Sequence, residues 1–128
     1  MSTFAQILVV GTGGFIGSSL RFVIGGWAQR LAPFSDFPLG TLVVNVSGCL
    51  LIGLLGGLAE LRQVLDPGLR LFLLIGVLGG FTTFSTFAYE TLSLGQDSEF
   101  FKAFINTVLQ VSLGFTTAWL GYSGARII

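Results

Sequence analysis

The chain has 128 residues and no net charge; 52% of its residues are hydrophobic and only 9% are charged, against about 25% charged in ordinary soluble domains. A soluble domain of this size could not bury so much apolar surface, so the sequence predicts one domain, residues 1–128, that lies in a lipid membrane. Histidine is absent, which excludes histidine catalysis and a histidine metal site, and the neutral charge leaves no basic surface for nucleic acid.

Four stretches are long enough to cross a membrane. A spanning helix needs about 20 mostly apolar residues, and we expect helices over about residues 4–27, 39–59, 69–89 and 100–122. Their links are short and polar, so both termini should lie on one side of the membrane. The first residues lack a charged n-region and a small-residue cleavage site, so we expect no signal peptide. The fold class is an all-α membrane protein of four transmembrane helices.

Basic residues flank the predicted helices almost equally on the two sides. The side with the termini carries Arg62, Arg70 and Arg126, and the other carries Arg30 and Lys102, with Arg21 nearby in the first helix. Lysine and arginine near helix ends set the orientation of a membrane protein. This near balance predicts a weak preference, so copies inserted both ways could pair antiparallel.

The third apolar stretch contains the most unusual segment, residues 79–90, where two glycines precede four hydroxyl residues interleaved with phenylalanines. Glycine and threonine weaken a straight helix. At membrane depth, a broken helix is tolerated only where it is buried in protein or faces a water-filled path. We therefore predict that the third helix is broken near its middle, at Gly79–Gly80, and that the segment lines an ion route.

The side chains after this break suit an anion. On a helix, Thr83, Thr86 and Glu90 would share one face, with Phe84 and Phe87 beside it. Phenyl rings have a positive edge that can face an anion without trapping it, and hydroxyl hydrogens can replace part of its water shell. Unwound carbonyls, by contrast, suit a cation. Phenylalanine stripes also arise from plain core packing, and that alternative stays open here.

Polar residues in the other helices have two possible roles. Arg21 either serves function, as intramembrane charges commonly do, or snorkels to the interface. Asn45 either bonds a neighbouring helix or offers its amide to a passing anion, while Gly13 and Gly17 indicate close helix packing. In the fourth helix, Asn106, Gln110, Gly114 and Thr117 share one face, and Ser112 and Thr116 lie on another. One of these faces should meet a partner helix and the other a wet path.

With these residues in view, the chain resembles the Fluc (CrcB) family of fluoride channels. The resemblance covers nearly the whole chain and rests on residues 13–17 leading to Arg21, on residues 40–45 leading to Gly48 and, most specifically, on residues 79–87. It implies an antiparallel, dual-topology homodimer in the bacterial inner membrane that exports fluoride passively through two pores. No enzyme activity is expected, because no nucleophile–base pair or metal cluster exists.

The resemblance also implies roles for single residues. Phe84 and Phe87 resemble the family's aromatic box, Asn45 its pore amide, and Ser85 and Thr86 members of its polar track. The carbonyls of Gly79 and Thr82 would hold a structural sodium ion at the dimer centre. The residues expected along the fluoride pathway are Asn45, Phe84, Phe87, Ser85, Thr86, Thr83, Ser112, Arg21 and Glu90. Ala88 departs from the family pattern, in which a serine is frequent.

Two other functions fit a protein of this size. A small dimeric, proton-coupled exporter of cationic drugs would need a membrane-embedded acid; the first helix has none, and Glu90 falls at the end of the third predicted helix. A non-transporting assembly partner would use the hydroxyls as contacts between helices. That alternative accounts for the glycines as helix-packing residues, but it does not account for a helix break at Gly79–Gly80 among phenylalanines.

Overall fold

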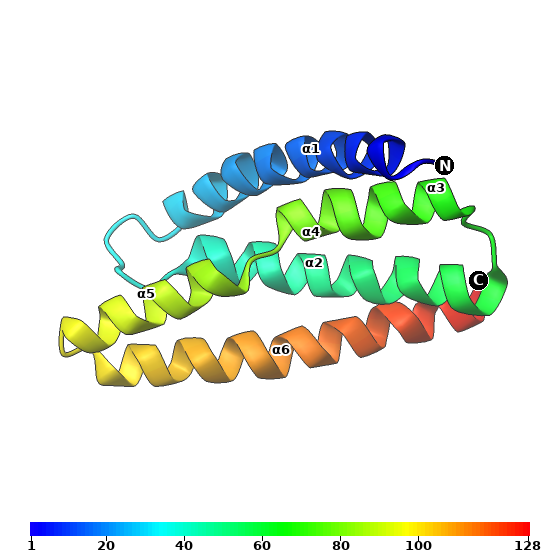
Figure 1. Cartoon of the computed structure of the whole chain (residues 1–128). Coiled ribbons are helices and arrows are strands. Elements are labelled where there is room, and N and C mark those ends of the chain that lie inside the picture. The colour runs from blue at the N-terminus through cyan, green and yellow to red at the C-terminus, as the bar shows by residue number, and fades with distance from the viewer.

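The computed structural model describes all 128 residues, and every element in it is a helix. The elements are α1 (Thr3–Arg30), α2 (Leu39–Gly57), η1 (Leu58–Arg62), α3 (Pro67–Arg70), η2 (Leu71–Val77), α4 (Leu78–Phe81), α5 (Phe84–Gln96) and α6 (Phe100–Ile127). They form four stretches long and apolar enough to cross a membrane. The two chain termini lie at the same end of the bundle (Figure 1). Both expectations from the sequence are confirmed.

The third and fourth crossings extend beyond the predicted ends. The third continues through α5 to Gln96 instead of stopping at residue 89, and α6 runs for 28 residues to Ile127 instead of stopping at 122. The last turns of α6 stay helical because Gly121 and Ala125 are buried against α2 and η1. The prediction that Glu90 falls at a helix end is therefore wrong: it lies in the middle of α5.

Glycines let α1 lie directly on the third crossing. Gly13 and Gly17 are buried, and a Cβ added to Gly13 would lie 2.9 Å from the Cα of Gly76. A Cβ on Gly80 would lie 2.7 Å from the Gly14 carbonyl oxygen. Close backbone contact of this kind is the main route to tight helix packing in lipid. The predicted packing role of Gly13 and Gly17 is confirmed.

The third crossing is broken, but at Thr82–Thr83 and not at Gly79–Gly80. Thr82 (φ −88°, ψ 155°) and Thr83 (φ −152°, ψ 122°) are extended, and they form the non-helical link between α4 and α5 in Figure 1. Gly79 and Gly80 stay inside α4, because Gly80 is needed for contact with α1. The break itself is confirmed, and its predicted position is wrong by three residues.

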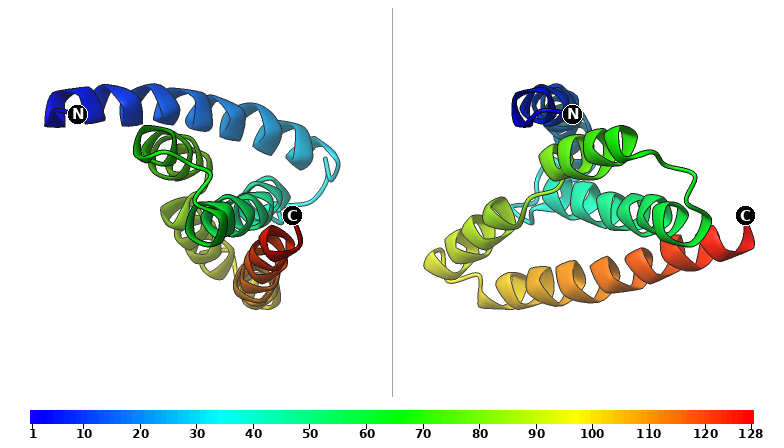
Figure 2. Two further views of the ribbon diagram at one scale, coloured as in Figure 1. Left: turned by 90° about the vertical axis from the view of Figure 1, so that its right-hand side faces the viewer. Right: turned by 45° about the vertical axis from the view of Figure 1, so that its right-hand side comes forward.

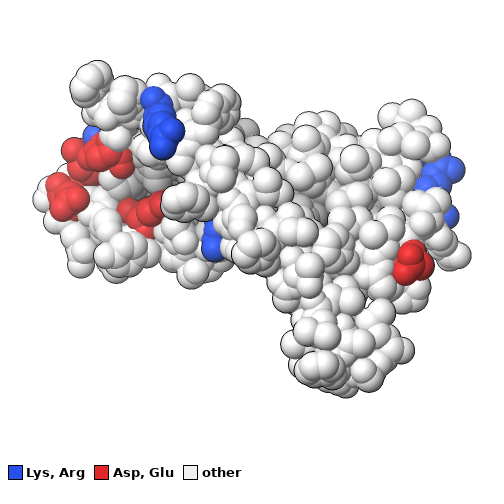
Figure 3. All heavy atoms as spheres, turned by 90° about the horizontal axis from the view of Figure 1, so that it is seen from above, with Lys and Arg blue, Asp and Glu red and all other residues white.

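The arrangement leaves much apolar surface outside. The two views in Figure 2 show α1 and α6 on opposite sides of α2, with α5 diverging from α4. Phe15 on α1 and Phe104 on α6 are 74% and 64% exposed, as expected for side chains that face lipid. Charged groups gather at the two ends of the molecule and are almost absent between them (Figure 3). The structure is that of a multi-pass membrane protein.

One charged contact fastens the link between α1 and α2. Lys102, near the start of α6, donates a hydrogen bond to Asp36 in this link, and its Nζ lies 3.4 Å from Glu99 Oε1. The Lys102 hydrogen bond holds the pKa of Asp36 below its usual value. A lowered carboxyl pKa gives stability that is lost only as the pH falls through that lowered value. The contact should therefore persist in mildly acidic solution.

Candidate functional site

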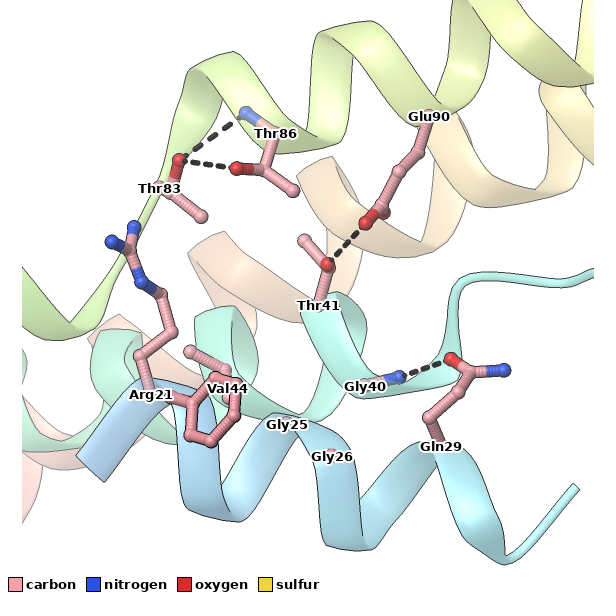
Figure 4. Close-up of a pocket in the computed structure, with 11 residues that line it drawn as sticks. Arg21, Gly25, Gly26, Gln29, Gly40, Thr41, Val44, Thr83, Thr86 and Glu90 are labelled. Carbon is pink, nitrogen blue, oxygen red and sulfur yellow. Dashed lines mark hydrogen bonds between the residues drawn. The ribbon is translucent and has the colours of Figure 1, made fainter. Parts of the chain in front are cut away.

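A cavity of about 470 Å³ opens between α1, α2 and α5. Its polar lining includes Arg21, Thr41, Thr83, Thr86 and Glu90. In Figure 4 the Arg21 side chain extends from α1 toward the Thr83 segment, and its guanidinium has no hydrogen-bond or ion-pair partner in the chain. The cavity therefore offers an uncommitted positive charge close to the helix break.

The opposite wall of this cavity carries a carboxylate. Thr41 Oγ1 donates to Glu90 Oε1 at 2.7 Å, and Glu90 Oε2 is buried without a partner. This hydrogen bond joins α5 to the start of α2 (Figure 4). Thr41 was not among the predicted pathway residues, although it lies one turn before Asn45 on the same face of α2. The structure thus adds Thr41 to the site.

The break is held open by Asn45. Its Nδ2 donates to the Thr83 carbonyl at 2.9 Å, and its Oδ1 accepts from the Thr83 N–H at 2.9 Å. The side-chain amide thus pairs with the extended residue as a neighbouring strand would, which satisfies backbone that lipid could not. In a continuous helix the Thr83 N–H would donate to the Gly79 carbonyl; here it donates to Asn45 instead, so Gly79 loses that partner.

Hydroxyl groups complete the start of α5. Thr83 Oγ1 accepts from the Thr86 N–H at 3.2 Å and so caps the helix. The Thr86 and Ser85 hydroxyls lie 3.2 and 3.3 Å from the same oxygen. Thr82 Oγ1 donates back to the Leu78 carbonyl at 2.9 Å. The threonines therefore end one helix and begin the next, which explains why the break falls on them.

A second cavity of about 250 Å³ lies on the other side of the break. Asn45, Thr83, Phe84, Phe87 and Gln110 are among its lining residues. The two phenylalanine rings are 5.5 Å apart and inclined at 70°, edge to face. Phe87 is buried, whereas Phe84 is 78% exposed, so the cavity is open on that side of the subunit. Thr83 lines both cavities and separates them.

The remaining predicted residues lie apart from these cavities or at their edge. Ser112 faces outward from α6, donates to the Val108 carbonyl and lines neither cavity. Gly79 is exposed on the subunit surface, and Thr82 lines the second cavity. Gln110 was not predicted, yet its Oε1 accepts from Asn45 Nδ2 at 3.1 Å. The polar face of the fourth helix was the signal that could have identified it.

These features define a class of protein: a small multi-pass membrane protein with a cavity on each side of a broken helix. The family profile described as "CrcB-like protein, Camphor Resistance (CrcB)" matches residues 8–122. The "Fluoride-specific ion channel FluC" of Nitratidesulfovibrio vulgaris is 42% identical over 96% of this chain and 98% of its own. Its namesake in Geobacter sulfurreducens is 45% identical over 94% and 96%. "Fluoride-specific ion channel FluC 3" of Methanosarcina barkeri is 44% identical over 90% and 86%. The chain belongs to the CrcB family.

Proposed function

We propose that this protein is a fluoride-selective ion channel of the bacterial inner membrane, through which fluoride leaves the cell passively. One observation carries the proposal. Asn45 holds Thr83 extended between two cavities, one beside Arg21 and the other beside the Phe84–Phe87 pair. Relatives that cover almost the whole chain are named as fluoride-specific channels.

The first cavity provides attraction without a trap. The free Arg21 guanidinium raises the local concentration of anions, and the partial positive charge at the start of α5 acts in the same direction. The Glu90 carboxylate, held by Thr41, offsets the Arg21 charge. An anion is thus bound firmly enough to enter and weakly enough to leave, as conduction requires.

Beyond the break, neutral groups replace water around the ion. The hydroxyls at the start of α5 supply donors, and Phe84 and Phe87 supply positive ring edges. Both N–H groups of Asn45 are already used, by Thr83 and Gln110, so its part is to hold the extended segment. A small anion that holds water tightly needs such close replacement. Chloride is larger and holds its water less tightly, so it gains less from closely placed donors. Selectivity therefore depends on how closely the ion approaches the donors at the break and the ring edges of the aromatic pair.

Release from proteoliposomes tests this function. Vesicles loaded with potassium fluoride should release fluoride to an external electrode, whereas matched vesicles loaded with chloride should release little. Release should need the fluoride gradient and a potassium ionophore to carry the balancing charge, with no imposed proton gradient. Equal release of the two halides would contradict fluoride selectivity.

The proton-coupled exporter remains the second candidate, because Glu90 lies in the middle of α5. That mechanism needs a titrating membrane acid. In it, Glu90→Gln would remove the response of transport to a proton gradient. A passive fluoride channel shows no change of transport rate in an imposed proton gradient. Measuring that rate in the unmodified protein therefore distinguishes the two functions.

A homodimer would complete the site. The second cavity is open where Phe84 is 78% exposed, and a path through lipid cannot have one wall missing. We infer that a second, oppositely inserted copy closes it, with Ser112 and Ser85 lining the path from the outward faces of α6 and α5. The near-equal basic charge at the two ends supports both orientations.

Tagging both termini tests this dual topology. Because the two orientations should be almost equally populated, a tag at either terminus should be found on both faces of the membrane, in similar amounts. Accessibility to a membrane-impermeant label in intact and in opened cells measures this. A tag confined to one face in all molecules would exclude the antiparallel pair.

The break would also suit a sodium ion at the centre of such a dimer. At the break, the Thr83 N–H donates to Asn45 and not to the Gly79 carbonyl, and Gly79 is exposed on the subunit surface. Carbonyl oxygens suit hard cations. In an antiparallel pair, Gly79 and Thr82 of each copy would hold the ion, which would supply positive charge between the two subunits.

The aromatic pair gives a direct test of the pathway. Phe84→Ile or Phe87→Ile keeps similar bulk but removes the positive ring edge, so fluoride release should fall by at least about tenfold, the effect of about 1.4 kcal/mol on a barrier. The rate is measured in proteoliposomes, and the dimer is followed by size-exclusion chromatography. Unchanged release would assign both rings to packing.

A further inference from the structure

Asn106 is the one polar residue that the subunit buries completely, with 0% of its surface exposed. It lies on α6 and faces α5, the half-helix that carries the aromatic pair. Burying an amide is costly unless its hydrogen-bonding groups are used. Its place in the fold therefore calls for a role, and none of the pathway contacts described above includes it.

A short relay joins Asn106 to the pathway. Its Nδ2 donates to Thr91 Oγ1 at 2.9 Å, and Thr91 Oγ1 donates to the Phe87 carbonyl at 2.8 Å. Thr91 follows Phe87 by one turn of α5. The Asn106 amide is thus connected, through the Thr91 hydroxyl, to the backbone of Phe87, whose ring lines the second cavity.

The position of α5 depends on few such contacts. The break at Thr82–Thr83 separates α5 from the axis of α4, and only Phe87 and Leu94 are buried along its length. Its main packing partner is α6. Asn45 holds the residue before its first turn, Thr41 bonds Glu90 in its second turn, and Asn106 bonds the next residue, Thr91. With so few buried apolar side chains, the position of α5 along α6 depends mainly on its hydrogen bonds.

The other end of the Asn106 amide points to the same network. Asn106 Oδ1 and Gln110 Nε2 are both buried without a partner in the chain. They belong to residues one turn apart on α6, and one is an acceptor while the other is a donor. Gln110 also bonds Asn45. The Asn45 and Asn106 contacts that place α5 therefore both involve one face of α6.

We propose that Asn106 is a positioning residue for the aromatic pair. Through the Thr91 hydroxyl it fixes the position of α5 along the axis of α6, and therefore the position of Phe87 along the path. This role rests on the proposed fluoride channel. A residue that merely joined two helices would change how much protein assembles. A positioning residue changes how fast each assembled channel conducts.

Unitary fluoride current in planar bilayers separates these roles. Asn106→Leu should lower the current through each channel by about threefold or more, the equivalent of one interhelical hydrogen bond. Thr107→Val is the matched control, because Thr107 is the next residue of α6, is exposed and bonds only the Ala103 carbonyl; its unitary current should equal that of the unmodified protein. An unchanged unitary current in Asn106→Leu, with fewer channels, would overturn the proposal.

The Thr91 variants decide the matter if Asn106→Leu does not assemble. Thr91→Val removes the relay and should reproduce the lower current, whereas Thr91→Ser keeps the hydroxyl and should restore it. Equal currents in the valine and serine variants would also overturn the positioning role. An unmodified protein that carried no fluoride current would instead contradict the proposed function, so the two failures are distinguishable.

Discussion

Replacing Asn45 with leucine should nearly abolish fluoride release. The substitution leaves the Thr83 N–H and carbonyl without partners at membrane depth, and each buried group left unpaired costs about 1–3 kcal/mol. The extended segment would then rearrange, because no other side chain in the chain bonds both groups. We expect a loss of at least about 100-fold in release from proteoliposomes, since about 2.7 kcal/mol on a barrier corresponds to that factor.

Ser47→Ala provides the control for Asn45→Leu. Ser47 lies on the same helix, and its hydroxyl bonds only the Val44 carbonyl one turn earlier. Its replacement should leave fluoride release within a factor of about two, because this half-buried hydroxyl bonds only its own helix. That factor corresponds to about 0.5 kcal/mol on a barrier. If Asn45→Leu conducted as well as this control, the extended Thr83 segment would not be part of the path.

Replacing Gly17 with valine should prevent the protein from assembling. A Cβ at this position would overlap the Val77 carbonyl oxygen and lie 2.9 Å from the Phe81 nitrogen. Both contacts are backbone, so neither can rotate away, and α1 would have to separate from η2 and α4. Forcing bulk into such a contact costs about 1–3 kcal/mol or more. Little protein should elute at the size of the native assembly in detergent.

Gly11 gives the matched comparison on the same helix. A Cβ there meets nothing within 4 Å, and alanine is the better helix former by up to about 1 kcal/mol. Gly11→Ala should therefore give normal yield and a normal elution profile. Normal assembly of Gly17→Val would show that α1 does not lie against the third crossing as described.

The four crossings and the break in the third could be predicted from the sequence, because both follow from local patterns. Apolar runs of about 20 residues predicted the four crossings, and two glycines followed by threonines predicted a break in the third. The amide at position 45 and the aromatic pair were recognised by residue type, and the structure places them around one cavity. Ends of helices were less predictable, because packing by Gly121 and Ala125 extends α6 where hydropathy falls.

The position of the break depended on a partner far along the chain. A glycine pair can signal either conformational freedom or close packing, and Gly80 serves the second purpose against Gly14. The true break needs Asn45, 38 residues earlier, to bond the Thr83 backbone. Gln110 and Asn106 were hidden for the same reason: their polarity was visible, but their partners became known only from the fold.

The 28 residues of α1 and of α6 have a further consequence. Each helix is about 42 Å long at 1.5 Å per residue, whereas the hydrocarbon layer is about 30 Å thick. This hydrophobic mismatch must be absorbed by leaning the helices or by carrying their ends into the headgroups. Because α5 packs on α6, a change in the tilt of α6 would also move α5. We therefore expect the conductance to depend on the chain length of the surrounding lipid.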